Sequence, residues 1–226
     1  MEQTVKKSIL NKKDKATLAR SAYYAIRDAI VKNEFKPGEI LSENMLADLL
    51  EMSRTPIREA LKELKNDDLV QLVPGTGIFV KEISEKELRD VFDVRISLEC
   101  LAAQTAPSFF DQAEIKDLLE IWSNLYSEID TLETTDYNKI TRHDNQLHNL
   151  LVHKSHNECL NRIYKSLQPK LLRYQLLCVQ SWGNAKNTVN QHIEILETIG
   201  KGDIRLLTKI LEIHLRAALD IIAKRL

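Results

Sequence analysis

The hydrophobic positions between residues 41 and 66 repeat at helical spacing in two short stretches separated by a tight turn. In a helix, residues three and four positions apart lie on one face, so such a repeat marks the side that packs against a core. The repeating positions are Met45, Leu46, Leu49 and Leu50 in the first stretch, and Ile57, Ala60, Leu61 and Leu64 in the second. Ser42 can cap the first helix. Two short helices joined at Glu51 and Met52 are the arrangement of a helix-turn-helix.

The second of these helices begins with a sequence that suits contact with a nucleic acid. Thr55 is predicted to be its N-cap and Pro56 its first helical residue, where a missing N–H costs nothing. Arg54 and Arg58 then lie at the end where free backbone N–H groups and the helix dipole favour phosphate, and a guanidinium can reach guanine edges bidentately. Arginine pairs on helices are commonly no more than solvated charges, but the helix-turn-helix setting favours a recognition helix.

A β-hairpin is predicted directly after the recognition helix. Residues 69–73 and 78–81 flank Pro74-Gly75-Thr76-Gly77, a run of turn residues. This hairpin would be the wing of a winged helix-turn-helix. Ahead of the helix-turn-helix, residues 16–33 show one more amphipathic helix, and the lysine-rich residues 1–14 are expected to form a mobile basic arm.

A second domain follows the winged helix-turn-helix of residues 1–81. Ser84 and Glu87 form a capping box that starts a helix. Six helices are predicted, over residues 84–106, 111–132, 135–153, 157–181, 184–199 and 203–224. Because short connections make neighbouring helices antiparallel, residues 84–226 should form a bundle. The predicted fold class is mainly α, with an N-terminal winged helix-turn-helix domain followed by an all-α antiparallel six-helix bundle.

The overall composition gives no support for a nucleic-acid partner. The 226 residues include 32 Lys and Arg and 33 Asp and Glu, a net charge of −1, so DNA binding has to be argued from local charge. The three cysteines lack CxxC spacing, which argues against a disulfide framework or a zinc knuckle. No apolar run reaches the roughly 18 residues of a membrane span and no signal peptide is evident, so we expect a cytoplasmic protein without a membrane partner.

The bundle carries a candidate metal site. Asp144 and His148 are four residues apart on one predicted helix, and both residue types bind divalent transition metals. Such a pair alone is more often a hydrogen-bonded surface pair. His192 and His214 lie near the apolar stripes of two further helices. Bundles build metal sites from side chains that converge from several helices, so these four residues together predict a divalent metal ion, zinc or nickel.

The N-terminal part of the chain resembles a known family. SRTPIREAL, followed by a Leu-Val strand and PGTGIFV, is similar to the DNA-binding domain of the GntR family of bacterial transcription factors, over roughly residues 10–81. The chain departs from the family pattern at Glu51, where glycine is usual, and at Asn44, where arginine is common. The resemblance implies that the operator is contacted by the recognition helix and the wing tip. The implied residues are Ser53, Arg54, Thr55 and Arg58 on the helix, and Gly75, Thr76 and Gly77 on the wing.

The C-terminal part resembles the FCD ligand-binding domain of the FadR subfamily of GntR regulators, in its VanR-like six-helix form. The similarity lies in DNQLH, NQHIEILETIGKGD and LEIHLRAAL, and it implies Asp144, His148, His192 and His214 as metal ligands. In VFDVRISLE, the resemblance implies that Arg95 binds an effector carboxylate. A salt bridge between Arg95 and Glu99 is the alternative. Gln191 departs from the family, which commonly has an acid at that position.

The resulting hypothesis is a ligand-responsive bacterial transcription regulator that binds a palindromic double-stranded DNA operator as a homodimer. A small carboxylate at the metal site would modulate it, and a sugar acid, an amino acid or a dicarboxylate would each fit. Two alternatives are a metal-dependent hydrolase that uses the same Asp and three His, and a regulator whose metal is structural or is itself the signal. The absence of HExxH, a phosphate loop or a nucleophile motif argues against an enzyme.

Overall fold

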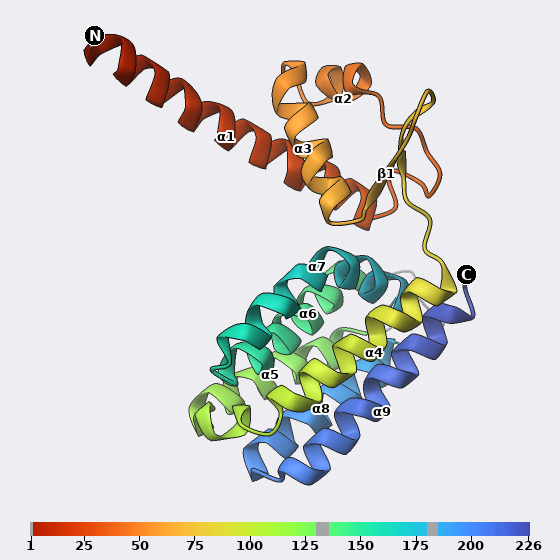
Figure 1. Cartoon of the computed structure of the whole chain (residues 1–226). Coiled ribbons are helices and arrows are strands. Elements are labelled where there is room, and N and C mark those ends of the chain that lie inside the picture. Colours follow the sequence, from red (N-terminus) through yellow and green to blue (C-terminus); the bar gives the residue numbers. More distant parts are fainter. Residues whose placement is uncertain (1, 130–135, 180–184) are drawn as a thin grey trace. The chain divides into compact units, whose positions relative to one another are not determined.

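The computed structural model describes residues 2–129, 136–179 and 185–226, with the side chains of residues 2–16, 176, 177 and 179 left out. The chain divides into two compact units, residues 1–82 and 83–226 (Figure 1). Each unit has its own hydrophobic core. None of the described helices is both long and apolar enough to cross a membrane.

Unit 1, residues 1–82, is a winged helix-turn-helix. Its elements are α1 (Glu2–Val31), α2 (Glu43–Leu49), α3 (Arg54–Asn66), β1 (Val70–Val73) and β2 (Gly77–Val80). The two strands are antiparallel, with Val70 opposite Val80 and Val73 opposite Gly77. Helix α1 begins at Glu2, so residues 2–14, which the sequence analysis set apart as an arm, belong to a helix.

The core of unit 1 lies under the apolar stripe that the sequence predicted for α3. The four repeating positions of that stripe are all buried, and α1 packs against the same helix through Ala22, Ile26 and Ile30. Ser42 caps α2, because its Oγ accepts a hydrogen bond from the Met45 backbone N–H at 3.1 Å. The predicted helix-turn-helix is therefore confirmed in the buried side of α3 and in its first cap, but Leu49, which was predicted on the inner side of α2, is 61% exposed.

The predicted start of α3 is wrong by two residues. Ser53 is the N-cap, with extended φ and ψ, and Arg54 and Thr55 are already helical. Pro56 is therefore the third helical residue. All N–H groups of a first helical turn lack an intrahelical acceptor, so proline is tolerated there as well as at the first position, and the proline does not fix the boundary.

The turn between α2 and α3 contains a strained backbone. Glu51 has φ of 53°, in the left-handed region that favours glycine. The chain thus keeps a turn conformation that suits glycine although it has a glutamate there.

Unit 2, residues 83–226, is a helical bundle. Its elements are α4 (Glu85–Ala102), the 3₁₀ turn η1 (Ala106–Phe109), α5 (Gln112–Glu128), α6 (Tyr137–Lys154), α7 (Glu158–Val179), α8 (Ala185–Lys201) and α9 (Ile204–Ala223). Figure 1 shows α4 and α9 side by side. The six predicted α-helices are confirmed over the described residues, whereas their predicted ends at residues 132, 135, 181 and 184 lie outside the described residues. The turn η1 stands where the first helix was expected to end, because Pro107 cannot continue a helix.

Four helices of unit 2, α4, α5, α6 and α9, begin at side-chain caps. Ser84 Oγ accepts from the Glu87 backbone N–H at 3.2 Å, as the capping box predicted, and the Glu87 carboxylate also pairs with Lys170 of α7 at 2.6 Å. Helix α4 contacts α6, α7 and α9, and α8 contacts α5, α6 and α9. The sides of α6, α8 and α9 that carry Asp144, His192 and His214 are buried in the interior.

We predict that Glu51→Gly stabilises the protein by roughly 0.5–1 kcal/mol, because relief of left-handed strain outweighs the extra backbone entropy of glycine. Urea unfolding followed by circular dichroism measures the change as a higher midpoint. The matched control is Glu59→Gly on the exposed face of α3, where helical glycine should lower stability by about 1 kcal/mol. A lower midpoint for Glu51→Gly would show that the turn is not strained.

Candidate metal centre and DNA-binding surface

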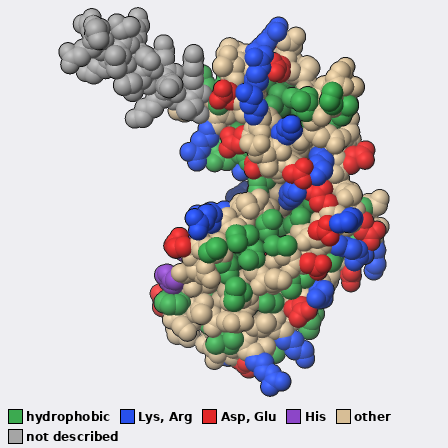
Figure 2. All heavy atoms as spheres, viewed as in Figure 1, with side chains coloured by type: hydrophobic (Ala, Val, Ile, Leu, Met, Phe, Trp, Pro, Cys, Tyr) green, Lys and Arg blue, Asp and Glu red, His purple; other side chains and the backbone are tan. Residues whose placement is uncertain are grey.

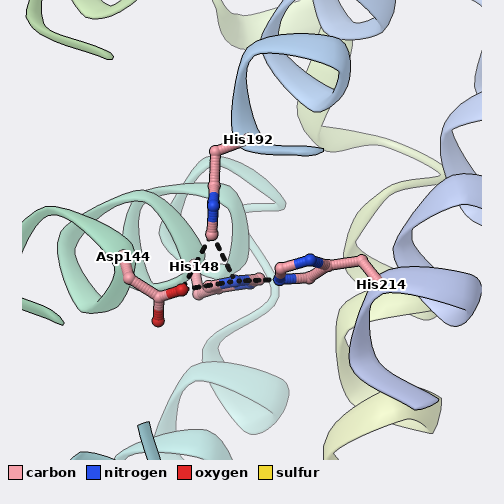
Figure 3. A group of neighbouring side chains, drawn as sticks. All are labelled: Asp144, His148, His192 and His214. Atoms are coloured by element: carbon pink, nitrogen blue, oxygen red, sulfur yellow. Dashed lines mark hydrogen bonds and ion pairs between the residues drawn. The ribbon is translucent and has the colours of Figure 1, made fainter. Parts of the chain in front are cut away.

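The structure brings the four predicted metal ligands together inside unit 2. Asp144 and His148 lie on α6, His192 on α8 and His214 on α9, and all four side chains are buried (Figure 3). One ligand atom from each residue lies within 4.8 Å of the others, so the group could hold a metal ion. The Nε2 atoms of His192 and His214 each lie 3.3 Å from Nε2 of His148, and His192 Nε2 lies 2.9 Å from Asp144 Oδ1.

Each histidine of this cluster has an acceptor for its other ring nitrogen. The Nδ1 atom of His148 lies 2.5 Å from Glu99 Oε2, that of His192 lies 2.7 Å from the Thr188 carbonyl oxygen, and that of His214 lies 2.8 Å from Gln191 Oε1. These oxygens only accept, so each Nδ1 carries a proton, and in the neutral form of each ring Nε2 is left with a lone pair. The geometry therefore aims three lone pairs at one another.

Positive charge among these lone pairs, from an added proton or from a metal ion, would stabilise them. A second proton on His192 would satisfy its 2.9 Å contact with Asp144, but it would leave the 3.3 Å contact between His148 and His214 without a hydrogen. Burial, and then the charges of His192 and His148, hold the pKa of His214 well below its usual value. His214 is therefore neutral, which is the form that binds a metal.

Asp144 supplies the negative charge of the centre. Burial alone would raise its pKa, but the neighbouring charges of His192, His148 and Arg95 lower it below the usual range. Gln175 Nε2 donates a hydrogen bond to Asp144 Oδ2. Trp122 of α5 stacks on the His192 ring, with ring centres 4.2 Å apart and planes 8° apart. The carboxylate and the His192 ring are thus both held in place by neighbours.

Arg95 forms the salt bridge that the sequence analysis held as an alternative. Its Nε donates to Glu99 Oε1 at 2.7 Å, and both residues are buried. Glu99 also accepts from Tyr164 OH at 2.8 Å and from His148 Nδ1. Burial alone would raise the Glu99 pKa, but the charges of His148 and Arg95 lower it. One carboxylate therefore connects Arg95 to a candidate metal ligand.

The salt bridge does not use all of Arg95. Its Nη2 is buried and has no hydrogen-bond partner among the described residues. Arg95 lines a cavity of about 20 Å³ together with Asp144, Gln175 and His214. The role of Glu99 was missed because the sequence spacing shows Arg95 as its partner but not a histidine 49 positions away. The roles of Gln175 and Thr188 could not be read from spacing for the same reason.

The predicted DNA-contact residues lie on the surface of unit 1. Ser53, Arg54, Thr55 and Arg58 are exposed at the N-terminal end of α3, and Gly75, Thr76 and Gly77 form the tip of the hairpin. Gly75 and Gly77 have φ of 78° and 135°, so the turn requires glycine at both positions. A groove of about 350 Å³ separates α3 from the hairpin, and Lys62 and Lys65 line it.

Arg58 has a partner that the sequence analysis did not foresee. Glu43 of α2 accepts from Arg58 Nε at 3.0 Å and from Nη2 at 2.8 Å, each on a different carboxylate oxygen. The hydrogen bond from Arg58 lowers the Glu43 pKa. This bidentate pair orients the arginine while it stays exposed, with Nη1 still available to another acceptor.

We predict that Glu99→Gln destabilises the protein by about 3–5 kcal/mol, because it removes the charged partner that is hydrogen-bonded to the buried Arg95 guanidinium. Chemical unfolding of the purified protein would measure the loss. The matched control is Glu85→Gln on the same helix, where the pair with Arg89 has the same spacing but is exposed, so its midpoint should not move. Equal midpoints for both variants would show that Arg95 does not depend on Glu99.

Comparison with known proteins gives the same two-part organisation. Residues 18–80 match the bacterial regulatory proteins of the gntR family, and residues 90–217 match the FCD domain. The HTH-type transcriptional regulator YdhC of Bacillus subtilis is 28% identical over 180 residues, which are 79% of each chain. The gluconate operon transcriptional repressor of B. subtilis is 27% identical over 166 residues, 74% of this chain and 67% of the relative.

Solved structures share the fold. The Escherichia coli protein McbR/YncC aligns with a TM-score of 0.77 at 19% identity, over 92% of this chain and 98% of that protein. A transcriptional regulator from Rhodococcus sp. RHA1 aligns with a TM-score of 0.74 at 21% identity, over 92% of this chain and 97% of that protein. The FCD match covers more than half of the chain, and the gntR match covers the helix-turn-helix ahead of it. The chain therefore belongs to the FCD-domain proteins and is a transcriptional regulator of the GntR family.

Proposed function

We propose that this regulator, in the FadR subfamily and its six-helix, VanR-like form, binds a palindromic operator as a homodimer and responds to a small carboxylate held beside a divalent metal ion. The observation that carries the proposal is the convergence of three Nε2 lone pairs on the Asp144 carboxylate. A buried set of this kind is stable only around a cation.

The residues present fit a transition metal. Nitrogens that bind one zinc ion at about 2.1 Å are roughly 3.4 Å apart in a tetrahedral site, and the two Nε2 separations from His148 are 3.3 Å. Imidazole and carboxylate suit zinc and nickel alike. Asp144, His148, His192 and His214 would hold the ion, and when bound it would supply positive charge for an anionic effector.

Arg95 supports the carboxylate part of the proposal. Arg95 lines the same cavity as Asp144 and His214, and its Nη2 has no partner among the described side chains. A guanidinium recognises a carboxylate through directed hydrogen bonds. Glu99 fixes the other side of the guanidinium through Nε, so Arg95 presents the free nitrogen in a defined position.

The surface of unit 1 supports the operator part. Arg54 and Arg58 lead α3 and are exposed, as a helix that enters the major groove requires. A palindromic site follows from two copies that each read one half-site. Effector binding would alter operator affinity only if the ligand binds two states of the dimer with different affinity. We propose repression as the mode, which is the role named for the gluconate operon relative.

Exposed hydrophobic residues support the homodimer. Val94 and Leu101 of α4 and Ile213 of α9 are exposed although they are large and apolar, and α4 lies next to α9. Figure 2 shows hydrophobic side chains gathered on one face of unit 2. Burial of such a patch against a second copy would remove it from water.

We predict that Arg58→Ala weakens operator binding roughly 10- to 100-fold while binding to random DNA falls less, because the arginine reads a base. Fluorescence anisotropy with an operator selected from a random DNA library measures both affinities. The control is Arg89→Ala, which removes an exposed arginine from unit 2 and should leave both affinities unchanged. Equal losses on the two DNAs would assign Arg58 to phosphate contact instead.

We predict about one divalent metal ion per chain, and a strong loss of metal affinity, of order 10-fold or more, in His214→Ala. Dialysis against zinc or nickel followed by elemental analysis measures the content. The control is His143→Ala, which removes the half-buried histidine beside Asp144 and should keep the metal. Equal metal content in the two variants would exclude His214 as a ligand.

Thermal unfolding of the same metal-loaded samples distinguishes a metal that belongs to an effector site from a metal that is purely structural. If small carboxylates raise the unfolding temperature and a chelator abolishes that rise, the metal belongs to the effector site. If the chelator alone destabilises the protein and no carboxylate has an effect, the metal is structural or is itself the signal, and the proposed effector site is excluded.

A further inference from the structure

The three histidines of the candidate metal centre differ in the group that faces their Nδ1 atom. His148 faces the carboxylate of Glu99 at 2.5 Å, and His192 faces a backbone carbonyl of α8 at 2.7 Å. An ionised carboxylate and a carbonyl can only accept, so each of these rings keeps its hydrogen on Nδ1. His214 instead faces the side-chain amide of Gln191 at 2.8 Å. An amide accepts through its oxygen and donates through its nitrogen, so this partner can serve either state of the ring.

The amide of Gln191 is free to turn over. A half-turn about the last bond of the side chain exchanges the oxygen and the nitrogen, which are similar in size. Gln191 is partly exposed, so water can meet whichever of the two atoms faces away from His214. With the oxygen toward His214, the hydrogen of the neutral ring is on Nδ1. With the nitrogen toward it, Nδ1 must accept and the hydrogen lies on Nε2.

The second orientation suits the centre without a metal ion. Nε2 of His214 lies 3.3 Å from Nε2 of His148 (Figure 3). While both rings carry their hydrogen on Nδ1, two lone pairs face each other, which is the arrangement for binding one metal ion. When His214 carries the hydrogen on Nε2, it donates to the lone pair of His148, and the same two atoms form a hydrogen bond.

We propose that Gln191 is a positioning residue that lets His214 alternate between two neutral tautomers, one for the metal-bound centre and one for the metal-free centre. In the exchange the Nδ1–H bond breaks and an Nε2–H bond forms, with water carrying the proton, so the net charge does not change. This inference rests on the proposed metal centre. It goes beyond that proposal because metal release then ends in a hydrogen bond instead of two facing lone pairs, which makes metal binding readily reversible.

The test is nitrogen-15 NMR of the histidine rings in the full chain, recorded at about pH 8, above the ordinary pKa of histidine. The shifts of Nδ1 and Nε2 show which nitrogen carries the hydrogen, and through-bond correlations to the backbone assign each ring. In the metal-free protein we expect the hydrogen on Nε2 of His214 but on Nδ1 of His148. After addition of zinc we expect it on Nδ1 of both rings.

Two variants on α8 assign the change to Gln191. Gln191→Glu supplies a group that only accepts, so His214 should keep its Nδ1 hydrogen with and without zinc. Zinc affinity, measured by competition with a chelating dye, should rise roughly 10-fold because the ligand is held in its metal-binding form. The control is Asn190→Asp, the same amide-to-acid change at the exposed neighbouring position. It should match the unmodified protein in both measurements.

The outcomes distinguish this inference from the proposed function. A hydrogen on Nδ1 of His214 in the metal-free unmodified protein overturns the inference, whether or not Nε2 is protonated as well. This measurement needs no variant, so it decides even if Gln191→Glu fails to fold. A folded Gln191→Glu that matches Asn190→Asp in tautomer or in zinc affinity also overturns it. If zinc leaves every histidine signal unchanged, the proposed metal centre fails, while the metal-free tautomer still decides the role of Gln191.

Discussion

The geometry of the candidate metal centre in unit 2 depends on one hydrogen bond to the Nδ1 atom of each of three histidine rings. Each Nδ1 donates to an oxygen, from Glu99 on α4 or from Thr188 and Gln191 on α8. These three bonds leave each Nε2 without a hydrogen and turn it toward Asp144. A buried cluster of lone pairs around a carboxylate is unfavourable unless positive charge lies among them. The interior of the bundle therefore combines apolar clusters with a polar group that could hold a cation.

Two arginine–glutamate pairs show how burial changes the role of the same chemistry. Arg58 and Glu43 meet on the surface of unit 1, where water and salt can replace either partner. Arg58 can therefore exchange part of this contact for another acceptor at small cost. Arg95 and Glu99 meet in the interior, where neither charge can lose its partner cheaply. The exposed pair suits an arginine that exchanges one acceptor for another. The buried pair suits an arginine whose side chain keeps a fixed position.

Local patterns in the sequence predicted the elements, and they predicted some site residues as well. The apolar spacing of Ile57, Leu61 and Leu64 placed α3 correctly, because those residues pack within one short segment of chain. The N-cap at Thr55 was wrong, because a proline fits any position of a first helical turn. Spacing also put Asp144 and His148 on one face of α6. The meeting of His192 and His214 with them was implied by family resemblance and is now a feature of the structure.

The contacts that tune the site could not be predicted in this way. Glu99 meets His148 across 49 residues, and Gln175 meets Asp144 across 31. Both depend on how α4, α6 and α7 rotate against one another, and a helix rotated by one residue would point either side chain about 100° away. Side chains on different helices are related by packing, which no periodicity within one helix records.

The stacking of Trp122 on His192 has a practical consequence. The chain has two tryptophans, and the ring of this one lies parallel to a candidate ligand ring at 4.2 Å. A change in the charge of that imidazole alters the electric field across the indole, and with it the energy of the indole excited state. The stacked pair would therefore serve as an intrinsic optical reporter of any change in charge at the candidate metal centre, without an added label.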